Sequence, residues 1–72
     1  MYFTYAIDIN LWKIPSGDLY CSLKGHRGII DSVEIFKNLG LIVSVSPEDK
    51  LLIVWDYYKC KIEEIVYFGE TI

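Results

Sequence analysis

Short apolar segments alternate with turn signals along the whole chain, and none of them has the period of a helix. Residues 7–12 alternate apolar and polar side chains, as expected for a strand with one buried face. Pro15 and Gly17 then mark a turn, because proline presets φ and glycine accepts a positive φ. The strands predicted in this way are residues 7–12, 19–23, 29–36, 41–46, 51–56 and 62–67. The pattern therefore indicates an all-β protein, an antiparallel meander of six short strands.

The segment at residues 51–55 narrows the choice of architecture. It contains five consecutive apolar residues, which a sheet exposed to water on one face would not tolerate. We therefore expect this strand to be buried on both faces, with partner sheets above and below it. A meander with about ten residues per strand and turn is typical of sandwiches, barrels and propellers.

Composition removes several alternatives. With 72 residues the chain is one small domain at most, and 53% of it is hydrophobic. The two cysteines, Cys21 and Cys60, and the single histidine, His26, cannot assemble a zinc ligand set. One disulfide is arithmetically possible, but so few cysteines favour a pair of free thiols in a reducing compartment. We expect no cofactor and no bound metal.

The charge balance is acidic, with 10 acidic against 7 basic residues and a net charge of −3. The basic surface that nucleic-acid binding requires is therefore not expected. The longest apolar runs, residues 40–43 and 51–55, are far shorter than the roughly 20 residues of a membrane-spanning helix. The N-terminus also lacks the positive region of a signal peptide. We expect a soluble, intracellular and cytoplasmic protein without membrane contact.

The chain contains an internal repeat. Trp12 and Trp55 lie 43 residues apart, and residues 9–13 align with residues 52–56. Each tryptophan is followed by a turn and then by a predicted strand. A period in the low forties with four strands per unit is the signature of a propeller blade.

Residues 19–56 resemble one WD repeat, a family of β-propellers, and several motif elements occur in the family's order. These elements are Gly25-His26, then Ile30, Val33 and Ile35, then Ser44-Val45-Ser46, Asp49 and Trp55-Asp56. The flanking repeats are degraded: Ala6 and Lys13 stand where aspartates are usual, and Gly69-Glu70 stands roughly where the next Gly-His would be. Pro47 and Glu48 make the turn before Asp49 one residue longer than usual.

The resemblance implies a domain plan. Residues 1–28 are expected to supply the third and outer strands of a preceding blade and a connecting loop. Residues 29–68 form one complete four-stranded blade, and residues 69–72 begin the next repeat. The predicted fold is thus an antiparallel four-stranded blade plus half a blade of a WD-repeat β-propeller. Repeat proteins need about three or more stacked units for stability. We therefore expect a fragment of a larger protein, with self-assembling copies of a short protein as the alternative.

One polar constellation has two interpretations. A serine, a histidine and an aspartate suggest a hydrolase triad, but Ser44 lacks the flanking glycines of a nucleophile elbow. The resemblance instead implies a buried hydrogen-bonded chain of Trp55, Ser44, His26 and Asp49. The donor and acceptor inventory supports this chain, in which the indole donates to the serine, the serine to the imidazole and the imidazole to the carboxylate. Ser46 is the alternative hydroxyl, and no catalytic residue is assigned.

The resemblance further implies a non-catalytic scaffold for protein–protein interaction. Its partners would be other protein subunits or further blades of the same polypeptide. The candidate partner-facing loops contain Arg27, Gly28, Pro47 and Glu48. Two alternatives remain open: a propeller domain attached to a catalytic domain outside this chain, and a small free-standing β-module that binds peptide by strand addition.

Overall fold

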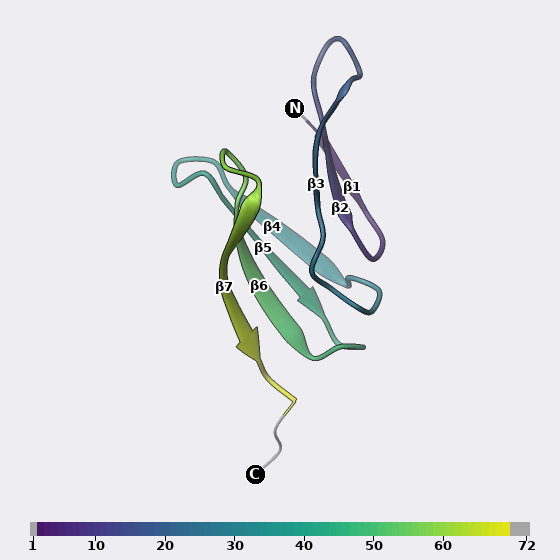
Figure 1. The fold of residues 1–72 in the computed structure, drawn as a ribbon, viewed down its shortest axis with the longest axis vertical. Coiled ribbons are helices and arrows are strands. Elements are labelled where there is room, and N and C mark those ends of the chain that lie inside the picture. The colour runs from purple at the N-terminus through teal and green to yellow at the C-terminus, as the bar shows by residue number, and fades with distance from the viewer. Residues whose placement is uncertain (1, 70–72) are drawn as a thin grey trace.

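The computed structural model describes residues 2–69 and contains two antiparallel sheets (Figure 1). The three-stranded sheet consists of β1 (Tyr2–Tyr5), β2 (Ile9–Trp12) and β3 (Leu19–Leu23). The four-stranded sheet consists of β4 (Ser32–Phe36), β5 (Leu41–Ser46), β6 (Leu51–Asp56) and β7 (Lys61–Tyr67). In both sheets the strands are hydrogen-bonded in sequence order. The predicted all-β antiparallel fold is confirmed, and the two sheets are consistent with propeller blades.

The sequence-based prediction missed β1. Tyr2, Phe3 and Tyr5 do not alternate with polar residues, so the segment lacks the pattern of a half-buried strand. It becomes a strand by pairing with β2, with Phe3 opposite Leu11. The N-terminal part therefore contributes three strands instead of the expected two. Over residues 2–69 no helix is present that is long and apolar enough to cross a membrane.

Two predicted strands begin later than expected. Residues 29–31 belong to the connection between the sheets, where the Ile30 amide donates to the Ala6 carbonyl at 2.7 Å and the Asp31 amide to the Val45 carbonyl at 2.8 Å. The strand expected from residue 29 therefore starts at Ser32. Similarly, the strand expected from residue 7 starts at Ile9, after a bend.

The three hairpin turns of the four-stranded sheet share one backbone feature, a left-handed residue directly before the following strand. Gly40, Lys50 and Cys60 have φ values of 67°, 59° and 55°, and each directly precedes a strand. In the β2–β3 turn Gly17 has φ 80°. A turn that ends in a left-handed residue is a common way to close a short hairpin. Glycine adopts this conformation without steric cost, whereas lysine and cysteine do not.

The core lies between the two sheets. The buried apolar residues are Ile9, Leu11 and Leu23 from the first sheet, Ile30 from the connection, and Ile42, Ile53, Trp55 and Tyr57 from the second sheet and its last turn. On the opposite face of the second sheet, Leu52 and Val54 remain half-exposed, and β7 is exposed along its whole length. The described residues thus cover one face of this sheet. The expectation that both faces of residues 51–55 are covered stays a prediction.

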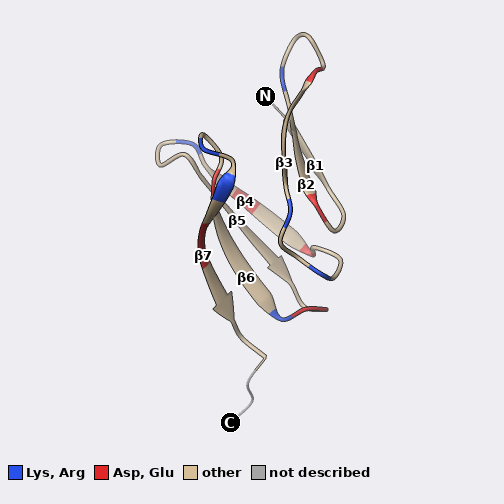
Figure 2. Cartoon of the chain, in the orientation of Figure 1, with Lys and Arg blue, Asp and Glu red and all other residues tan. Residues whose placement is uncertain are grey.

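Charged residues lie mainly on the turns, on the β3–β4 connection and on β7, while β4 carries Glu34 alone (Figure 2). Strands β1, β2, β3 and β5 carry no charge, and β6 carries only Asp56 at its end. The central strands β5 and β6 are therefore apolar except for Ser44, Ser46 and the terminal Asp56. A chain of buried polar side chains is unexpected in such a sheet.

Candidate functional site

The four residues of the predicted polar chain come from four different elements. Ser44 lies on β5 and Trp55 on β6, where Ser44 is opposite Ile53 and Trp55 is opposite Ile42. Because side chains alternate along a strand, Ser44 and Trp55 project on the same face as diagonal neighbours. His26 comes from the β3–β4 connection and Asp49 from the β5–β6 turn.

Gly25 allows the β3–β4 connection to approach this face. A Cβ atom at position 25 would lie 2.9 Å from the Trp55 ring and 3.3 Å from the Ile53 side chain. The φ of Gly25 is not in the left-handed region, so space and not backbone conformation requires a glycine here. The absence of a side chain places the next residue, His26, directly beside the sheet.

The structure brings the four side chains together in one hydrogen-bonded chain. The Trp55 indole Nε1 donates to the Ser44 Oγ at 2.8 Å. The Ser44 Oγ lies 2.7 Å from the His26 Nε2, and the His26 Nδ1 lies 2.9 Å from the Asp49 Oδ2. Indole can only donate, so the serine hydroxyl proton is left for the Nε2, and the Nδ1 proton is directed at the carboxylate. Over residues 2–69, no buried side-chain nitrogen or oxygen lacks a hydrogen-bond partner.

Asp49 is the point at which this chain meets the backbone. Its Oδ2 also accepts the Arg27 amide at 2.8 Å, and its Oδ1 accepts the Leu51 amide at 2.9 Å. Burial acts to raise the pKa of the Asp49 carboxyl, but the hydrogen bonds from Arg27, His26 and Leu51 outweigh it and hold the pKa below the ordinary value of 3.8. The carboxylate is therefore ionised at neutral pH. Asp49 therefore links the loop that carries His26 to the β5–β6 turn by hydrogen bonds.

Burial determines what this arrangement can do chemically. The exposed fraction of Ser44 is 0%, and that of His26 is 5%. The Ser44 oxygen is enclosed by the indole and the imidazole, so a substrate has no approach to it. A buried polar network with every member satisfied stabilises one arrangement of its elements. The hydrogen bonds therefore hold the β3–β4 loop, the β5–β6 turn and the sheet in one arrangement.

Ser46, the alternative hydroxyl, has a different partner. Its Oγ donates to the Ile29 carbonyl at 2.8 Å. Ser46 is fully buried and lies two residues beyond Ser44 on the same face of β5. The structure therefore brings Ser44, and not Ser46, to the imidazole, while Ser46 holds the connection between the sheets.

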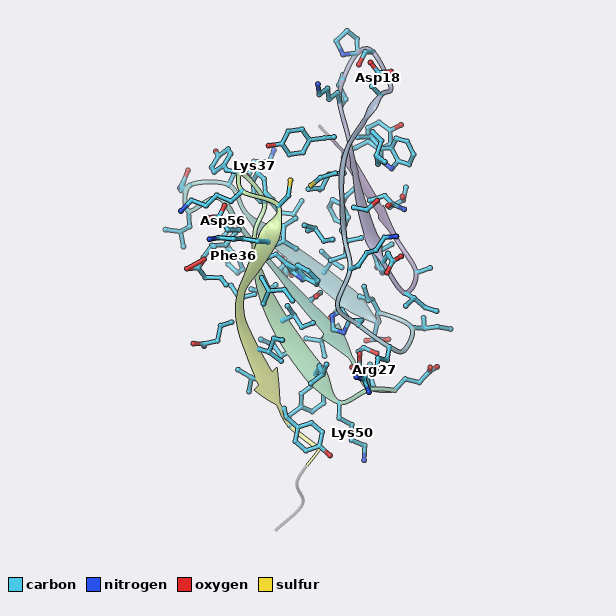
Figure 3. The ribbon with its side chains drawn as sticks, in the orientation of Figure 1. Asp18, Arg27, Phe36, Lys37, Lys50 and Asp56 are labelled. Carbon is cyan, nitrogen blue, oxygen red and sulfur yellow. The ribbon has the colours of Figure 1, made fainter. Side chains whose placement is uncertain are left out.

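The candidate partner-facing loops are only partly exposed. Arg27, Pro47 and Glu48 are exposed, whereas Gly28 is buried. A Cβ atom at position 28 would lie 2.4 Å from the Glu48 Cβ, so Gly28 is packed beneath that residue and offers no outward surface. Arg27 and Lys50 lie at the same end of the four-stranded sheet, opposite to Lys37 and Asp56 (Figure 3). Contact of this end with a partner stays a prediction.

Sequence reasoning missed a second pair of the same kind. In the first sheet the Trp12 Nε1 donates to the Thr4 Oγ1 at 3.0 Å. Trp12 is opposite Tyr2, as Trp55 is opposite Ile42, so Thr4 holds the position that corresponds to Ser44. The repeat of the tryptophans was visible in the sequence. Thr4 was not, because it lies eight residues before its tryptophan, whereas the second pair is separated by eleven.

A cleft of about 310 Å³ opens between the sheets at the opposite end, beside the β4–β5 and β6–β7 turns. Its walls are mostly apolar and aromatic, with Phe3, Tyr57 and Tyr58 among them, and Lys37 is its one charged lining residue. Tyr57 is buried, and burial followed by the neighbouring Tyr58 raises its pKa. The residues that line the cleft include no carboxylate, histidine or cysteine. Over residues 2–69, moreover, no group of three or more His, Cys, Asp or Glu side chains is placed to hold a metal ion.

Comparison with known proteins gives one informative match. No protein-family model matches the chain. The chain is similar to the periodic tryptophan protein 2 homolog of Neurospora crassa, with 34% identity over 53 residues. The match covers 74% of this chain but only 6% of the curated relative's length. The chain is therefore an all-β antiparallel protein that resembles a short stretch of a much longer periodic tryptophan protein.

Proposed function

We propose that this chain is a WD-repeat segment of a non-catalytic β-propeller that serves as a scaffold for protein–protein interaction. The observation that carries the proposal is the buried chain of Trp55, Ser44, His26 and Asp49 within one four-stranded antiparallel sheet. The hydrogen bonds connect strand, loop and turn without leaving a reactive group at the surface. Such a network maintains the shape of a blade, as the WD-repeat resemblance implies.

The repetition of the tryptophan–hydroxyl pair supports the same proposal. The pairs of Trp12 with Thr4 and of Trp55 with Ser44 occur at equivalent register in the two sheets. Trp55 faces the first sheet, and Trp12 lies on the face of that sheet that is turned away from the core. The faces that carry the tryptophans therefore point in the same direction in both sheets. This is the arrangement expected when successive blades follow one another around a propeller.

The similarity to a periodic tryptophan protein also supports the proposed repeat, since that protein is named for tryptophans that recur at intervals. The two tryptophans of this chain are separated by 43 residues, within the range of one blade. We propose that further blades of the same polypeptide or other protein subunits are the partners. Their contact surface would include the loops that carry Arg27, Pro47 and Glu48, which are exposed at one end of the sheet.

The scaffold role is tested by a charge swap at this end, R27E with E48K, in the full polypeptide. The matched control is K59E with E63K, which exchanges the same charges on exposed residues of the β6–β7 turn and β7. We expect proteins that copurify with the wild type in fixed stoichiometry to be lost from the first variant and retained by the control. Both variants should keep the wild-type unfolding midpoint, because all four side chains are exposed.

Two results would contradict the proposal. A full polypeptide that purifies without any stoichiometric protein partner would remove the scaffold role. An experimental structure in which the outer face of β4–β7 is covered by something other than another antiparallel sheet would remove the propeller. The two results are distinguishable, since a propeller without partners would retain its fold.

A further inference from the structure

The cleft between the two sheets, beside the β4–β5 and β6–β7 turns, has room for one aromatic ring and a short polar group. Its volume is about 310 Å³. A cavity of about 150 Å³ is already enough to hold benzene. Among residues 2–69 its lining is apolar or aromatic apart from Lys37, and it comes from both sheets. Concave sites with mostly apolar walls and few polar groups are typical of ligand binding.

One wall of the cleft, formed by Tyr57 and Tyr58, is held in place by the fold. The Tyr58 amide donates to the Asp56 Oδ1 at 3.0 Å, and the Tyr58 carbonyl accepts the Tyr20 hydroxyl at 3.2 Å. The Tyr58 ring lies against Gly40, where a Cβ atom would collide with it. Tyr57 is buried, and its ring centroid lies 4.9 Å from that of Tyr58. A wall that is already ordered loses little conformational entropy when a ligand binds.

Positive charge gathers at this end of the four-stranded sheet, although the whole chain has a net charge of −3. Residues 36–41 and 56–61, the two turns with their flanking positions, contain Lys37, Lys59 and Lys61 against Asp56 alone (Figure 2). The Asp56 carboxylate already accepts two amides of its own turn. Over residues 2–69 the one close pair of opposite charges is the imidazole–carboxylate pair of the polar chain, so no carboxylate there is paired with Lys37.

These charges select among the groups that aromatic walls accept. Aromatic rings attract cations as well as apolar groups. A cation in this cleft would be repelled by the Lys37 ammonium that lines it and by the two lysines nearby. An apolar group beside a negative charge meets no such repulsion, and its carboxylate gains a partner at Lys37.

The surface next to the cleft indicates that the ligand is a peptide segment and not an isolated small molecule. A second hollow shares Ile35 and Lys37 with the cleft and continues over Phe36 and Leu39. The Phe36 side chain is 45% exposed and the Leu39 side chain 68%. A peptide that enters the cleft can extend across these residues and cover apolar surface that a molecule confined to the cleft leaves in water.

We propose that the cleft binds an apolar or aromatic side chain of a partner protein that is followed by an aspartate or glutamate. The apolar side chain enters between the sheets, and the carboxylate pairs with Lys37. This site lies at the opposite end of the sheet from the loops that carry Arg27 and Glu48 (Figure 3). It therefore adds a second contact surface to the one named under the proposed function.

The test titrates the full polypeptide with capped tetrapeptides and follows the peptide by saturation-transfer NMR. The probe is Ser-Phe-Glu-Ser, and the matched peptides are Ser-Phe-Gln-Ser, Ser-Phe-Lys-Ser and Ser-Ala-Glu-Ser. We expect the glutamate peptide to bind about two- to fivefold more tightly than the glutamine peptide, because one partly exposed ion pair is gained. The lysine peptide should bind more weakly than both. Loss of the phenyl ring should weaken binding at least about tenfold, and the ring protons should receive the strongest saturation.

Four substitutions of exposed residues locate the site. K37Q should abolish the preference for glutamate over glutamine, whereas K59Q on the neighbouring turn, outside the lining, should keep it. Y58A should weaken the glutamate and glutamine peptides by the same factor, because it removes an apolar wall and no charge. Y67A removes an exposed tyrosine of β7 outside the lining and should leave binding unchanged. The urea midpoint of each variant verifies that it is folded.

Three results would overturn the proposal. If no peptide binds, the cleft of the full polypeptide is not a peptide site. If the lysine peptide binds more tightly than the glutamate peptide, the aromatic walls bind a cation instead. If K37Q and K59Q keep the same preference for glutamate, the carboxylate is not read by Lys37. The inference does not rest on the WD-repeat assignment, and R27E with E48K should bind the peptides like the wild type, so its failure leaves the proposed scaffold function untouched.

Discussion

Replacement of Asp49 by alanine tests the polar chain most directly. The carboxylate accepts three hydrogen bonds, from the His26 Nδ1 and from the amides of Arg27 and Leu51. D49A removes all of them while it leaves the surrounding apolar residues in place. The His26 side chain is 0% exposed, so its N–H loses its partner without gaining water.

The expected loss of stability depends on which of the three donors can form a hydrogen bond with water after the substitution. A buried donor without a partner costs about 1–3 kcal/mol. The Arg27 amide belongs to an exposed residue and recovers a hydrogen bond with water, so it adds little. The Leu51 amide is half-buried and adds up to about 1 kcal/mol. We expect D49A to destabilise the folded protein by about 1–4 kcal/mol in urea unfolding of the full polypeptide.

E48A is the matched control, since it removes the same charge from the adjacent position of the same turn. Glu48 is exposed, and its one hydrogen bond, from the Ile29 amide, is long at 3.4 Å. Its replacement should therefore change stability by less than about 0.5 kcal/mol. If D49A and E48A gave the same unfolding midpoint, the assignment of the polar chain as a structural tie would be wrong.

The stability difference between wild type and D49A should also depend on pH. The folded-state pKa of Asp49 lies below the ordinary 3.8, so the folded protein binds this proton less readily than the unfolded chain. Its contribution is then fully present above about pH 4 and is lost as the pH falls through the lower, folded-state pKa. Unfolding curves recorded at pH 7 and in acid should show the difference shrinking. A constant difference would contradict the role of the carboxylate charge.

Three further substitutions follow from the same geometry. S44A should cost about 1–3 kcal/mol in urea unfolding, because the Trp55 indole and the His26 Nε2 both lose their buried partner, and an unchanged midpoint would contradict the chain. G25A should cost about 1–3 kcal/mol, since a Cβ atom there meets the Trp55 ring at 2.9 Å; a neutral result would show that the connection can move away. K50G should stabilise the protein by about 0.5–1 kcal/mol, because Lys50 has a left-handed φ of 59°, and a lower thermal midpoint would refute this reasoning.

Local chemistry in the sequence predicted β3 and most of the second sheet. The limits of β3, β5 and β6 agree with the predicted strands, and β7 begins one residue earlier than expected. Alternation of side chains and the turn residues determine these limits, and both act over a few positions. The left-handed residues were predictable only where glycine occupies them, as at Gly17 and Gly40. At Lys50 and Cys60 the hairpin imposes a conformation that these residue types do not prefer.

The first sheet shows where local reasoning ends. β1 has no alternation of its own and becomes a strand because β2 offers it a partner. Thr4 is recognisable as the counterpart of Ser44 only through the register with Trp12, since both the strands β1 and β2 and the turn between them are shorter than their counterparts in the second sheet. The hydrogen bond from the Tyr20 hydroxyl to the Tyr58 carbonyl, at 3.2 Å, likewise depends on how the sheets pack.

By itself, the sequence determined the all-β class, most of the strands and the tryptophan repeat, because each of these depends on neighbours along the chain or on a fixed period. The members of the polar chain were implied by the resemblance to a WD repeat, which left both Ser44 and Ser46 open. The tertiary structure alone decided that Ser44 and not Ser46 meets His26 and that Gly28 is covered by Glu48. These outcomes depend on the path of one connection across the sheet. That path is set by packing between residues far apart in sequence, which local propensity does not encode.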